Sequence, residues 1–445
     1  MYQPASQTAR AIVNRALQQS VACFPDLQPV SLELDGLHER DRHLALAIYR
    51  VVIQRWLSIH HVLERLSTRR LSLMEPALQA ILMSGAAQLL FFSRLPAYAV
   101  VHESVELASA MIRPGAGRIV NAILRKVSNL VDQIVEDDSW SMRSNQLPVV
   151  GGYLVLKQAV FPDPQQEWIR YLSLAGSHPQ WLVKRWLKCF GREVTTSICL
   201  HHLMPVPTIV AVGTDFNCEA VSPDWQAHDV PGFVVWRGSY QGLKAFLDQD
   251  PNRRVQDPSS SYAVRETAGL SVHRILDYCA GRGTKTRQIL NMHTEAEVTA
   301  WEVDIRKRAD LLSLRELFPD IRIAEHEQSL DEDSFDLVVV DVPCSNSGVL
   351  GRRPEAKYRL NQKSLESLIM LQRDILKRAS ELVKSGGYIL YSTCSVEEEE
   401  NAQQISWFLE QCGAQKIAEH IHLPGGVMEK AYHDGAYFAL ARVEK

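Results

Sequence analysis

The sequence predicts a multidomain α and α/β protein, with an all-α helical bundle at the N-terminus, a small α+β module, and a C-terminal α/β domain with a largely parallel sheet. Three observations support this class. A chain of 445 residues is too long for one compact core. Apolar residues recur at helical spacing through residues 1–135, and short apolar runs alternate with helical stretches after about residue 253.

The helical bundle is predicted over residues 1–135. Apolar residues there are three or four positions apart, as at Leu44, Ala47, Ile48 and Val51. Further helical segments are expected at 71–92, 99–111 and 118–130. Pro or Gly signals separate these segments and the loops are short, as is usual in helical bundles.

The middle of the chain is predicted to hold a linker and the small module. The linker is expected at 136–165, where the periodicity weakens and a Gly151-Gly152 pair occurs. The α+β module is expected at 166–252. Its predicted elements are a helix at 178–186 and β-rich runs at 208–212 and 233–236.

The α/β domain is predicted over residues 253–445. Short apolar runs that alternate with helical stretches are typical of βαβ units and a parallel sheet. Its strands are expected at 274–277, 298–302, 337–341 and 388–392. Proteins with such sheets bind their ligands at the carboxyl ends of the strands. The residues just past these strands are therefore the candidates for a ligand-binding site.

Composition excludes several classes of protein. No apolar run approaches the roughly 20 residues of a membrane span, and the N-terminus lacks the apolar segment of a secretory signal, so a cytoplasmic protein is expected. The 8 cysteines include no CxxC pair and no zinc-type spacing, so no metal is expected. The net charge of -4 does not show the excess of basic residues that nucleic-acid-binding proteins usually have.

A glycine-containing turn follows the strand expected at 274–277 and opens a helix. Such a turn lets a ligand approach the backbone. It is not a dinucleotide GxGxxG motif, because Thr286 stands in place of the third glycine, nor a P-loop, because Thr284 precedes Lys285. The next strand leads to Glu302, whose carboxylate can accept hydrogen bonds from two ribose hydroxyls. A nucleoside-containing ligand is therefore expected.

Two cysteines lie just past the ends of predicted strands. Asp341 and Cys344 follow one strand, and Cys394 follows the next. Each cysteine occupies a polar Pro-Cys-Ser or Thr-Cys-Ser turn, which favours a reactive thiol over an apolar packing role. The remaining cysteines are interpreted as small buried apolar residues, namely Cys23, Cys189, Cys199, Cys218, Cys279 and Cys412.

These residue types suit the methylation of a pyrimidine. C5 of cytosine is a poor nucleophile, and a thiolate that adds to C6 makes the ring an enamine whose C5 can attack a methyl-sulfonium. A carboxylic acid such as Asp341 can hydrogen-bond N3 and the exocyclic amine and stabilise the charge that develops. The C5 proton must then leave and the thiol must be eliminated, so a second group is needed to assist release.

The motifs that carry these residues resemble those of a known family. Residues 341–345 and 392–401 resemble the two cysteine motifs of RNA 5-methylcytosine methyltransferases, and 256–260 resembles the motif that precedes their fold. Over nearly the whole chain, the sequence is most similar to the RsmB/Sun (Fmu) family of 16S rRNA cytosine-C5 methyltransferases. The resemblance implies a NusB-like helical domain that binds RNA or protein, a small RNA-binding module, and a Rossmann-like S-adenosylmethionine-dependent methyltransferase domain.

The resemblance also implies a role for each candidate residue. Cys394 is the nucleophile, Cys344 assists product release, and Asp341 is the acid near N3. S-adenosylmethionine is bound by Cys279, Ala280, Gly281, Arg282, Gly283, Thr284, Lys285, Glu302 and Asp341. RNA phosphates are contacted by Arg352, Arg353 and Lys357. The implied partner is rRNA, bound by a monomer that needs neither membrane nor metal.

Two turns depart from the pattern of the family. The usual first turn reads Cys-Ala-Ala-Pro-Gly-Gly-Lys-Thr, whereas here Gly281 replaces an alanine, Arg282 a proline and Thr284 a glycine. The turn after the first cysteine, 345–348, reads Ser-Asn-Ser-Gly rather than Ser-Gly/Ala-Thr-Gly. The Gly-Asp whose acid holds the adenine amine in the family has no counterpart at 324–328.

Two other hypotheses stay open. The altered first turn is compatible with an RNA-binding or ribosome-assembly protein that has lost cofactor binding, although both cysteines and Asp341 are retained. A small-molecule or protein methyltransferase on the same fold would have no use for two cysteines at strand ends. Binding of S-adenosylmethionine separates the first hypothesis from an active enzyme. Which cytosine is modified depends on RNA shape, which no motif encodes.

Overall fold

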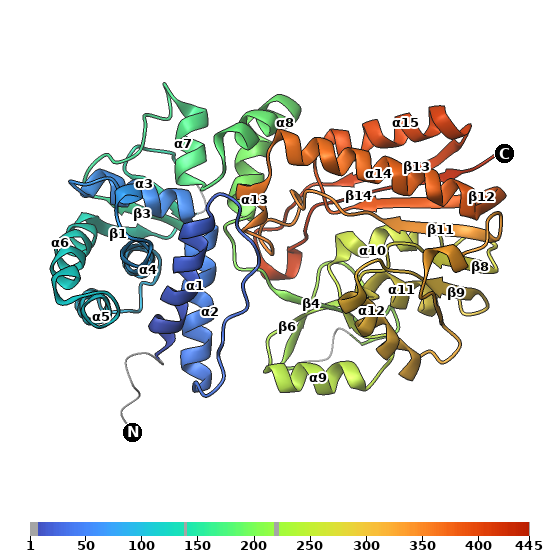
Figure 1. Cartoon of the computed structure of the whole chain (residues 1–445), viewed down its shortest axis with the longest axis horizontal. Helices are drawn as coiled ribbons and strands as arrows, with labels where there is room; N and C mark the ends of the chain where they lie inside the picture. The colour runs from blue at the N-terminus through green and yellow to red at the C-terminus, as the bar shows by residue number, and fades with distance from the viewer. Residues whose placement is uncertain (1–7, 138–139, 218–221, 445) are drawn as a thin grey trace. The chain divides into compact units, whose positions relative to one another are not determined.

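The computed structural model describes residues 8–137, 140–217 and 222–444 (Figure 1). The chain divides into two compact units. The first comprises Met1–Pro205 and Leu350–Arg359, and the second Val206–Val349 and Leu360–Lys445. Within the described ranges, no helix combines the length and the apolar character that crossing a membrane requires.

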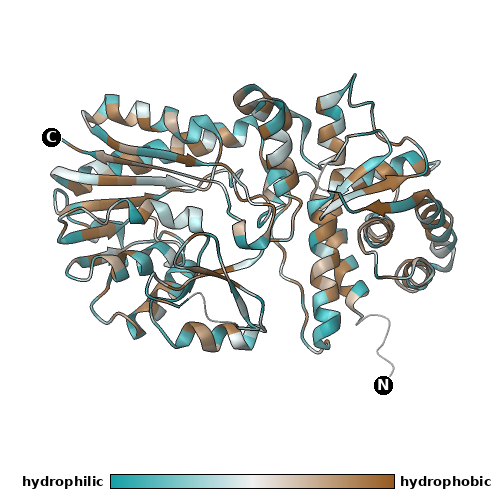
Figure 2. Cartoon of the chain, turned by 180° about the vertical axis from the view of Figure 1, so that it is seen from behind, coloured by the Kyte–Doolittle hydropathy of each residue, from teal (hydrophilic) through white to brown (hydrophobic). Residues whose placement is uncertain are grey.

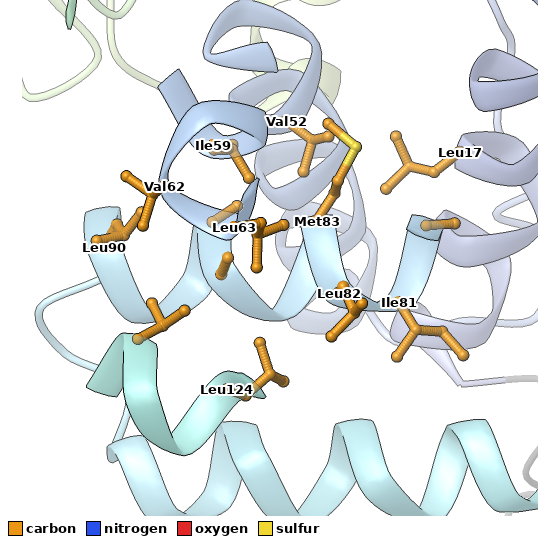
Figure 3. Close-up of a cluster of buried hydrophobic side chains, with 14 of the residues drawn as sticks. Leu17, Val52, Ile59, Val62, Leu63, Ile81, Leu82, Met83, Leu90 and Leu124 are labelled. Carbon is orange, nitrogen blue, oxygen red and sulfur yellow. The ribbon is translucent and has the colours of Figure 1, made fainter. Parts of the chain in front are cut away.

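The central helix of the first unit is α4 (Pro76–Phe91), which begins with proline, a favoured first helical residue. It is apolar on all sides, as expected of a helix that other helices surround. Its neighbours are α1 (Ala9–Cys23), α2 (Glu39–Gln54), α3 (Trp56–Leu66), α5 (Ala97–Met111) and α6 (Pro114–Leu130), and the short η2 (Leu71–Leu73) precedes it. Figure 3 shows Ile81, Leu82 and Met83 of α4 among buried side chains of these helices. The predicted helical bundle is confirmed.

A three-stranded antiparallel sheet follows the bundle. Its strands are β1 (Val131–Val135), β2 (Gln146–Val149) and β3 (Gly152–Leu156), in the order β1-β3-β2. The pair at 151–152, which suggested a linker, makes the β2–β3 turn, and Gly151 has a φ of 71° there. Leu147, Leu154 and Leu156 are buried in the same core as the helices. The linker prediction for 136–165 is therefore wrong for the described residues, which leave out 138 and 139.

The predicted module at 166–252 is divided between the two units. Helices α7 (Trp168–Ala175) and α8 (Gln180–His201) belong to the first unit, where Tyr171 and Ala175 join the core of the bundle. Helix α13 (Ala356–Arg359), although late in the chain, also belongs to the first unit. The expectation of one module failed because the periodicity of a helix does not show which element its apolar face covers.

The rest of the predicted module forms a small antiparallel sheet in the second unit. The strands are β4 (Thr208–Ala211), β5 (Trp225–Ala227), β6 (Phe233–Trp236) and β7 (Arg254–Val255), in the order β5-β6-β4-β7, and α9 (Tyr240–Asp248) connects β6 to β7. Val210, Val234 and Trp236 pack with Phe246 of α9 on one face of this sheet. The β-rich runs expected at 208–212 and 233–236 are thus β4 and β6.

The large sheet of the second unit has the order β10-β9-β8-β11-β12-β14-β13. Its strands are β8 (Arg274–Asp277), β9 (Glu297–Ala300), β10 (Arg322–Ile323), β11 (Phe335–Asp341), β12 (Val383–Thr393), β13 (Gln415–His422) and β14 (Ala436–Arg442). The pairs from β10 to β12 are parallel, and β14 is antiparallel to both β12 and β13. The predicted α/β domain is confirmed, and its strand order reverses between β8 and β11, where such sheets bind ligands.

Helices cover both faces of this sheet. They are α10 (Pro258–Arg265), α11 (Thr284–Met292), α12 (Ile305–Leu312), α14 (Gln362–Leu382) and α15 (Ala402–Cys412), with the short η3 (Ser313–Glu316), η4 (Glu327–Ser329), η5 (Glu398–Glu400) and η6 (Glu429–Ala431). Val338 and Val340 of β11 pack with α14 and α15, whereas Leu337 and Val339 pack with α10 and α11. This alternation is that of a strand buried on both sides. In Figure 2 the helices carry both hydrophobic and hydrophilic residues, as helices with one buried face do.

Candidate active site

The two cysteines that the sequence singles out lie in contact. Cys344 follows β11 and Cys394 follows β12, and the parallel register of these strands pairs Asp341 with Ser392. The two sulfur atoms are 3.2 Å apart, and both side chains are partly buried. The hydrogen bond with Cys394, followed by burial, raises the pKa of Cys344 well above its ordinary value. With this spacing, the two sulfur atoms are close enough to act on the same pyrimidine ring.

Asn346 completes the contacts of the cysteine pair. The Cys394 thiol donates to Asn346 Oδ1 at 3.4 Å, and the Asn346 amide donates to the Cys344 carbonyl at 3.0 Å. Asn346 has a φ of 61°, in the left-handed region that favours glycine and that asparagine tolerates better than most residues. In the sequence it is visible only as a departure from the glycine or alanine of the family, which does not reveal the contact with Cys394.

Asp341 is held by two side chains at the carboxyl end of β11. Ser392 Oγ donates to Asp341 Oδ1 at 2.8 Å, and Lys285 Nζ forms an ion pair with Asp341 Oδ2 at 2.8 Å. Lys285 also donates to Ser260 Oγ at 3.3 Å. The turn after β8, the motif at 256–260 and the end of β11 thus meet at one point. Lys285, expected only as a cofactor residue, lies against the carboxylate that is expected to act near N3.

The turn expected to hold the cofactor lies between β8 and α11. It is hydrogen-bonded to Glu302, which lies just past the end of β9. Gly281 N donates to Glu302 Oε2 at 2.8 Å, and Asp304 N donates to Glu302 Oε1 at 2.9 Å. Gly281 and Gly283 both have left-handed backbones, with φ of 58° and 88°. A Cβ on Gly283 would lie 2.6 Å from Leu314 Cδ1, so this position requires glycine.

The residues of this turn fit S-adenosylmethionine. A Cβ on Gly281 would meet no atom within 4 Å, so the backbone there is open to a ligand. Each oxygen of Glu302 accepts one backbone hydrogen bond and keeps a further lone pair for a ribose hydroxyl. Arg282, which stands where the family has proline, is largely exposed and pairs with Asp310 at 2.8 Å, so its side chain does not fill the turn. Cys279, Ala280 and Thr284 lie in the same turn.

Asp277, the last residue of β8, is a buried carboxyl that the sequence analysis did not single out. Thr286 Oγ1 donates to its Oδ2 at 2.6 Å, while its Oδ1 is buried with no hydrogen-bond partner among the described residues. Burial raises the pKa of Asp277 to about 7. The signal that could have indicated it is its position at the end of the first strand, immediately before the glycine-containing turn.

Asp277→Asn is expected to flatten the pH dependence of stability. Between the ordinary pKa of 3.8 and the raised value of about 7, the folded state binds the proton more tightly than the unfolded state. The free energy of unfolding of the unmodified protein should therefore fall as pH rises through this window, by about 4 kcal/mol relative to the variant. Urea denaturation at pH 5 and pH 8 covers about two pKa units of this window, so the measured difference should be about 2.5 kcal/mol. Asp320→Asn, at an exposed carboxylate, is the control, and parallel behaviour of both variants would contradict the expectation.

The three basic residues expected to contact RNA phosphates, Arg352, Arg353 and Lys357, lie in two different environments. Arg352 and Arg353 are exposed, whereas Lys357 is 0% exposed and donates to the Gln54 carbonyl at 2.8 Å. Burial, followed by the charge of Arg55, lowers the pKa of Lys357 well below its ordinary value. The expected phosphate contact is therefore wrong for Lys357, because its amine is held inside the first unit. No local feature of the sequence indicates this burial.

The other cysteines follow the expected packing role only in part. Cys199 is buried and Cys279 and Cys412 are partly buried, but Cys23 and Cys189 are exposed, so the buried-residue interpretation is wrong for those two. Cys218 lies outside the described residues. Among the residues that the structure describes, no group of three or more His, Cys, Asp or Glu side chains could hold a metal ion.

Comparison with family models finds two matches, one in each half of the chain. Residues 270–429 match the model of a family described as 16S rRNA methyltransferase RsmB/F. Residues 7–129 match the model of the NusB family. The first match includes the glycine-containing turn, both cysteines and Asp341, and the second covers the helical bundle.

Individual relatives extend the similarity over most of the chain. The ribosomal RNA small subunit methyltransferase B of Proteus mirabilis is 27% identical over 455 residues, which cover 98% of each chain. The probable ribosomal RNA small subunit methyltransferase B of Bacillus subtilis is 25% identical over 413 residues, 89% of this chain and 86% of that protein. A solved methyltransferase homolog from Pyrococcus horikoshii has a TM-score of 0.50 at 19% identity, over 63% of this chain and 100% of that one, which is a likeness of fold.

Proposed function

We propose that this protein transfers a methyl group from S-adenosylmethionine to C5 of a cytosine in 16S rRNA, a proposal that the matches of residues 7–129 to the NusB family model and of residues 270–429 to the RsmB/F methyltransferase model support. The observation that carries the proposal is the contact between the two thiols, whose sulfur atoms are 3.2 Å apart. They lie just past the ends of β11, which bears Asp341, and of the neighbouring β12. The relatives from Proteus mirabilis and Bacillus subtilis, named as small subunit rRNA methyltransferases, support the substrate class.

Cys394 is the proposed nucleophile. Its thiolate adds to C6 of the cytosine, and the electron pair of the C5–C6 double bond moves toward N3, where charge develops. Asp341, acting as the acid, donates its proton to N3 and accepts a hydrogen bond from the exocyclic amine, which stabilises that charge; the proton returns to Asp341 when the N3 electron pair moves back into the ring. Before the base binds, Lys285 pairs with Asp341 at 2.8 Å and Ser392 donates a hydrogen bond to it, so the side chain is held in place at the strand end.

The residues around the glycine-containing turn are proposed to hold the methyl donor. Glu302 accepts hydrogen bonds from the ribose hydroxyls, and the backbone at Gly281 lies against the ligand. When bound, S-adenosylmethionine supplies an electrophilic methyl group on sulfonium sulfur. The helix α11, which begins directly after Gly283, fixes the orientation of the turn.

Cys344 is proposed to release the product. As a thiolate it takes the proton from C5, the electrons of that C–H bond restore the C5–C6 double bond, and the Cys394 thiolate leaves C6. The contact of 3.2 Å between the sulfur atoms supports a role for Cys344 in breaking the bond between Cys394 and C6. The largest cause of its raised pKa is the hydrogen bond with Cys394, and this cause is removed once the Cys394 sulfur is bonded to C6, which favours loss of the Cys344 proton and its action as a base.

Transfer of an isotope-labelled methyl group to purified 16S rRNA tests the function. The rRNA is offered free of protein and as the assembled small subunit, and the product is digested to nucleosides. Labelled 5-methylcytidine is expected, with more label on the free rRNA, because the target base must be flipped out to reach the site. Label on another nucleoside would contradict the proposed chemistry. A lack of heat on titration with S-adenosylmethionine would favour a protein that has lost its cofactor.

RNA affinity is expected to depend on Arg352 and Arg353 but not on Lys357. Lys357→Met should leave the dissociation constant within about twofold, whereas Arg352→Ala with Arg353→Ala should weaken binding and reduce its dependence on salt. Electrophoretic mobility shifts at several salt concentrations measure both. Equal weakening by a folded Lys357→Met variant would contradict the assignment.

The same variant has an expected effect on stability. The folded state lowers the pKa of Lys357 below its ordinary 10.5, so below that pH the unfolded state binds a proton that the folded state lacks. Stability of the unmodified protein should therefore fall relative to Lys357→Met as pH decreases from 10.5 toward the lowered pKa. Thermal unfolding of both proteins across this range tests the sign of the difference.

A further inference from the structure

A buried carboxylate lies behind both cysteine turns. Glu400 is the last residue of η5, and its side chain is 0% exposed. Four donors surround it. Ser345 N and Gln372 Nε2 donate to Oε1 at 2.9 and 3.0 Å, and Ser345 Oγ and Ser395 Oγ each donate to Oε2 at 2.5 Å. The hydroxyl distances are those of strong bonds to a carboxylate.

The position of these donors links the two turns. Ser345 directly follows Cys344, and Ser395 directly follows Cys394. One carboxylate oxygen thus receives a hydroxyl from each turn, and the two hydroxyls are also 3.0 Å from each other. A movement of the backbone that separates the two turns must stretch the bonds to Glu400, since serine side chains are too short to follow.

Neighbouring polar side chains hold the carboxylate itself in place. Gln372 of α14 also donates to the Pro343 carbonyl at 2.9 Å, and it receives a hydrogen bond from Gln404. Asn401 donates to the Ser395 carbonyl at 2.9 Å and accepts from Thr393 at 2.7 Å. The network is buried and each member has several partners, which makes it rigid rather than adaptable.

We propose that Glu400 is a positioning residue for methyl transfer, which fixes the distance between the two cysteine sulfurs through its paired bonds to Ser345 and Ser395. This inference rests on the proposed function, in which Cys394 attacks and Cys344 releases. Sequence reasoning missed Glu400 because the acidic run at 397–400 resembles a short solvated segment, whereas the side chain of its last member accepts hydrogen bonds from both cysteine turns.

The charge of Glu400 also acts on Cys344. The hydrogen bond with Cys394 contributes most to the raised pKa of the Cys344 thiol, followed by burial and by the charge of Cys394. The negative charge of Glu400 raises this pKa further. Other ionisable groups near this cluster are Tyr391, whose hydroxyl donates to the Glu400 carbonyl at 2.6 Å, and Asp341 and Tyr437, which both act on Tyr391. Replacing Glu400 with glutamine removes the charge and keeps the size of the side chain.

Glu400→Gln is the test, with Glu398→Gln as the matched control, because Glu398 is exposed and undergoes the same chemical change. In Glu400→Gln, kcat for methyl transfer should fall roughly tenfold or more through misplacement of the thiols. KM for RNA and for S-adenosylmethionine should stay within about twofold, because Glu400 touches neither ligand. The control should behave as the unmodified protein. Unchanged kcat in folded Glu400→Gln, or a loss that lies wholly in KM, overturns the proposal.

A second measurement needs no substrate. Alkylation of Cys344 by iodoacetamide, followed at peptide level across pH, should show a midpoint moved down by about half a unit to one unit in Glu400→Gln. This result is independent of whether the protein methylates RNA, so it separates failure of the inference from failure of the proposed function. An unchanged midpoint overturns the inference. Where Glu400→Gln does not fold, Ser395→Ala takes its place, and wild-type kcat in that folded variant overturns the inference.

Discussion

Cys394→Ala is expected to abolish methyl transfer, with a loss of at least about a thousandfold in kcat, because C5 of cytosine is not nucleophilic until a thiolate has added to C6. The variant leaves the main-chain register of β12 and the buried bonds of the neighbouring Ser395 in place. Its structure and its binding of S-adenosylmethionine should therefore stay close to those of the unmodified protein.

The loss can be separated from a general effect of cysteine replacement. Cys23→Ala removes an exposed thiol from α1 in the first unit and should retain full activity. Transfer of labelled methyl groups to 16S rRNA, with heat of cofactor binding as a check of folding, measures both variants. Activity of Cys394→Ala within about tenfold of the unmodified protein would show that another residue attacks the base.

Cys344→Ala is expected to stop turnover at a later step. Cys394 can still attack and C5 can still accept the methyl group, but the base that removes the C5 proton is missing. The enzyme should therefore transfer about one methyl group per molecule and remain bound to RNA through sulfur. Denaturing gel electrophoresis should show a complex that survives detergent, and mass spectrometry should find the modified peptide.

The double variant Cys344→Ala with Cys394→Ala is the control for this trapping. It should form no complex, because the atom that binds C6 is absent. Normal multiple turnover by Cys344→Ala would assign release to another base. Loss of the first turnover as well would mean that Cys344 acts in the attack, for example by holding the Cys394 thiolate across the 3.2 Å contact.

The α/β domain could be predicted because its signals are local. The strand expected at 274–277 is β8 without any change of bounds, and the runs at 337–341 and 388–392 lie within β11 and β12. Parallel strands end at a common edge, so Asp341, Cys344 and Cys394 could be placed together before any coordinates were known.

The first unit was harder to predict because its boundaries depend on contacts between distant segments. Gly151 and Gly152 are compatible with both a linker and a tight turn, and the pairing of β2 with β3 decides between them. The helices α7 and α8 are amphipathic in either unit. Lys357 looked like a surface base among arginines, and only its bond to the Gln54 carbonyl, far away in the chain, shows that it is buried.

Within the site, the sequence indicated the reacting groups but not the groups that hold them. Asn346, Glu400 and the pairing of Lys285 with Asp341 depend on side-chain directions that residue spacing does not encode. Short polar residues beside a catalytic motif are common in turns, so their types alone do not distinguish a solvated turn from a buried network.

Trapping with RNA that contains 5-fluorocytidine tests the cysteine chemistry most directly. Fluorine at C5 cannot leave as the proton does, so the bond between Cys394 and C6 should persist after methyl transfer. The predicted result is a peptide that carries a methylated 5-fluorocytidine on Cys394, formed only when S-adenosylmethionine is present. Attachment at another residue, or methyl transfer to ordinary cytidine without any trapped complex, would contradict nucleophilic attack by Cys394.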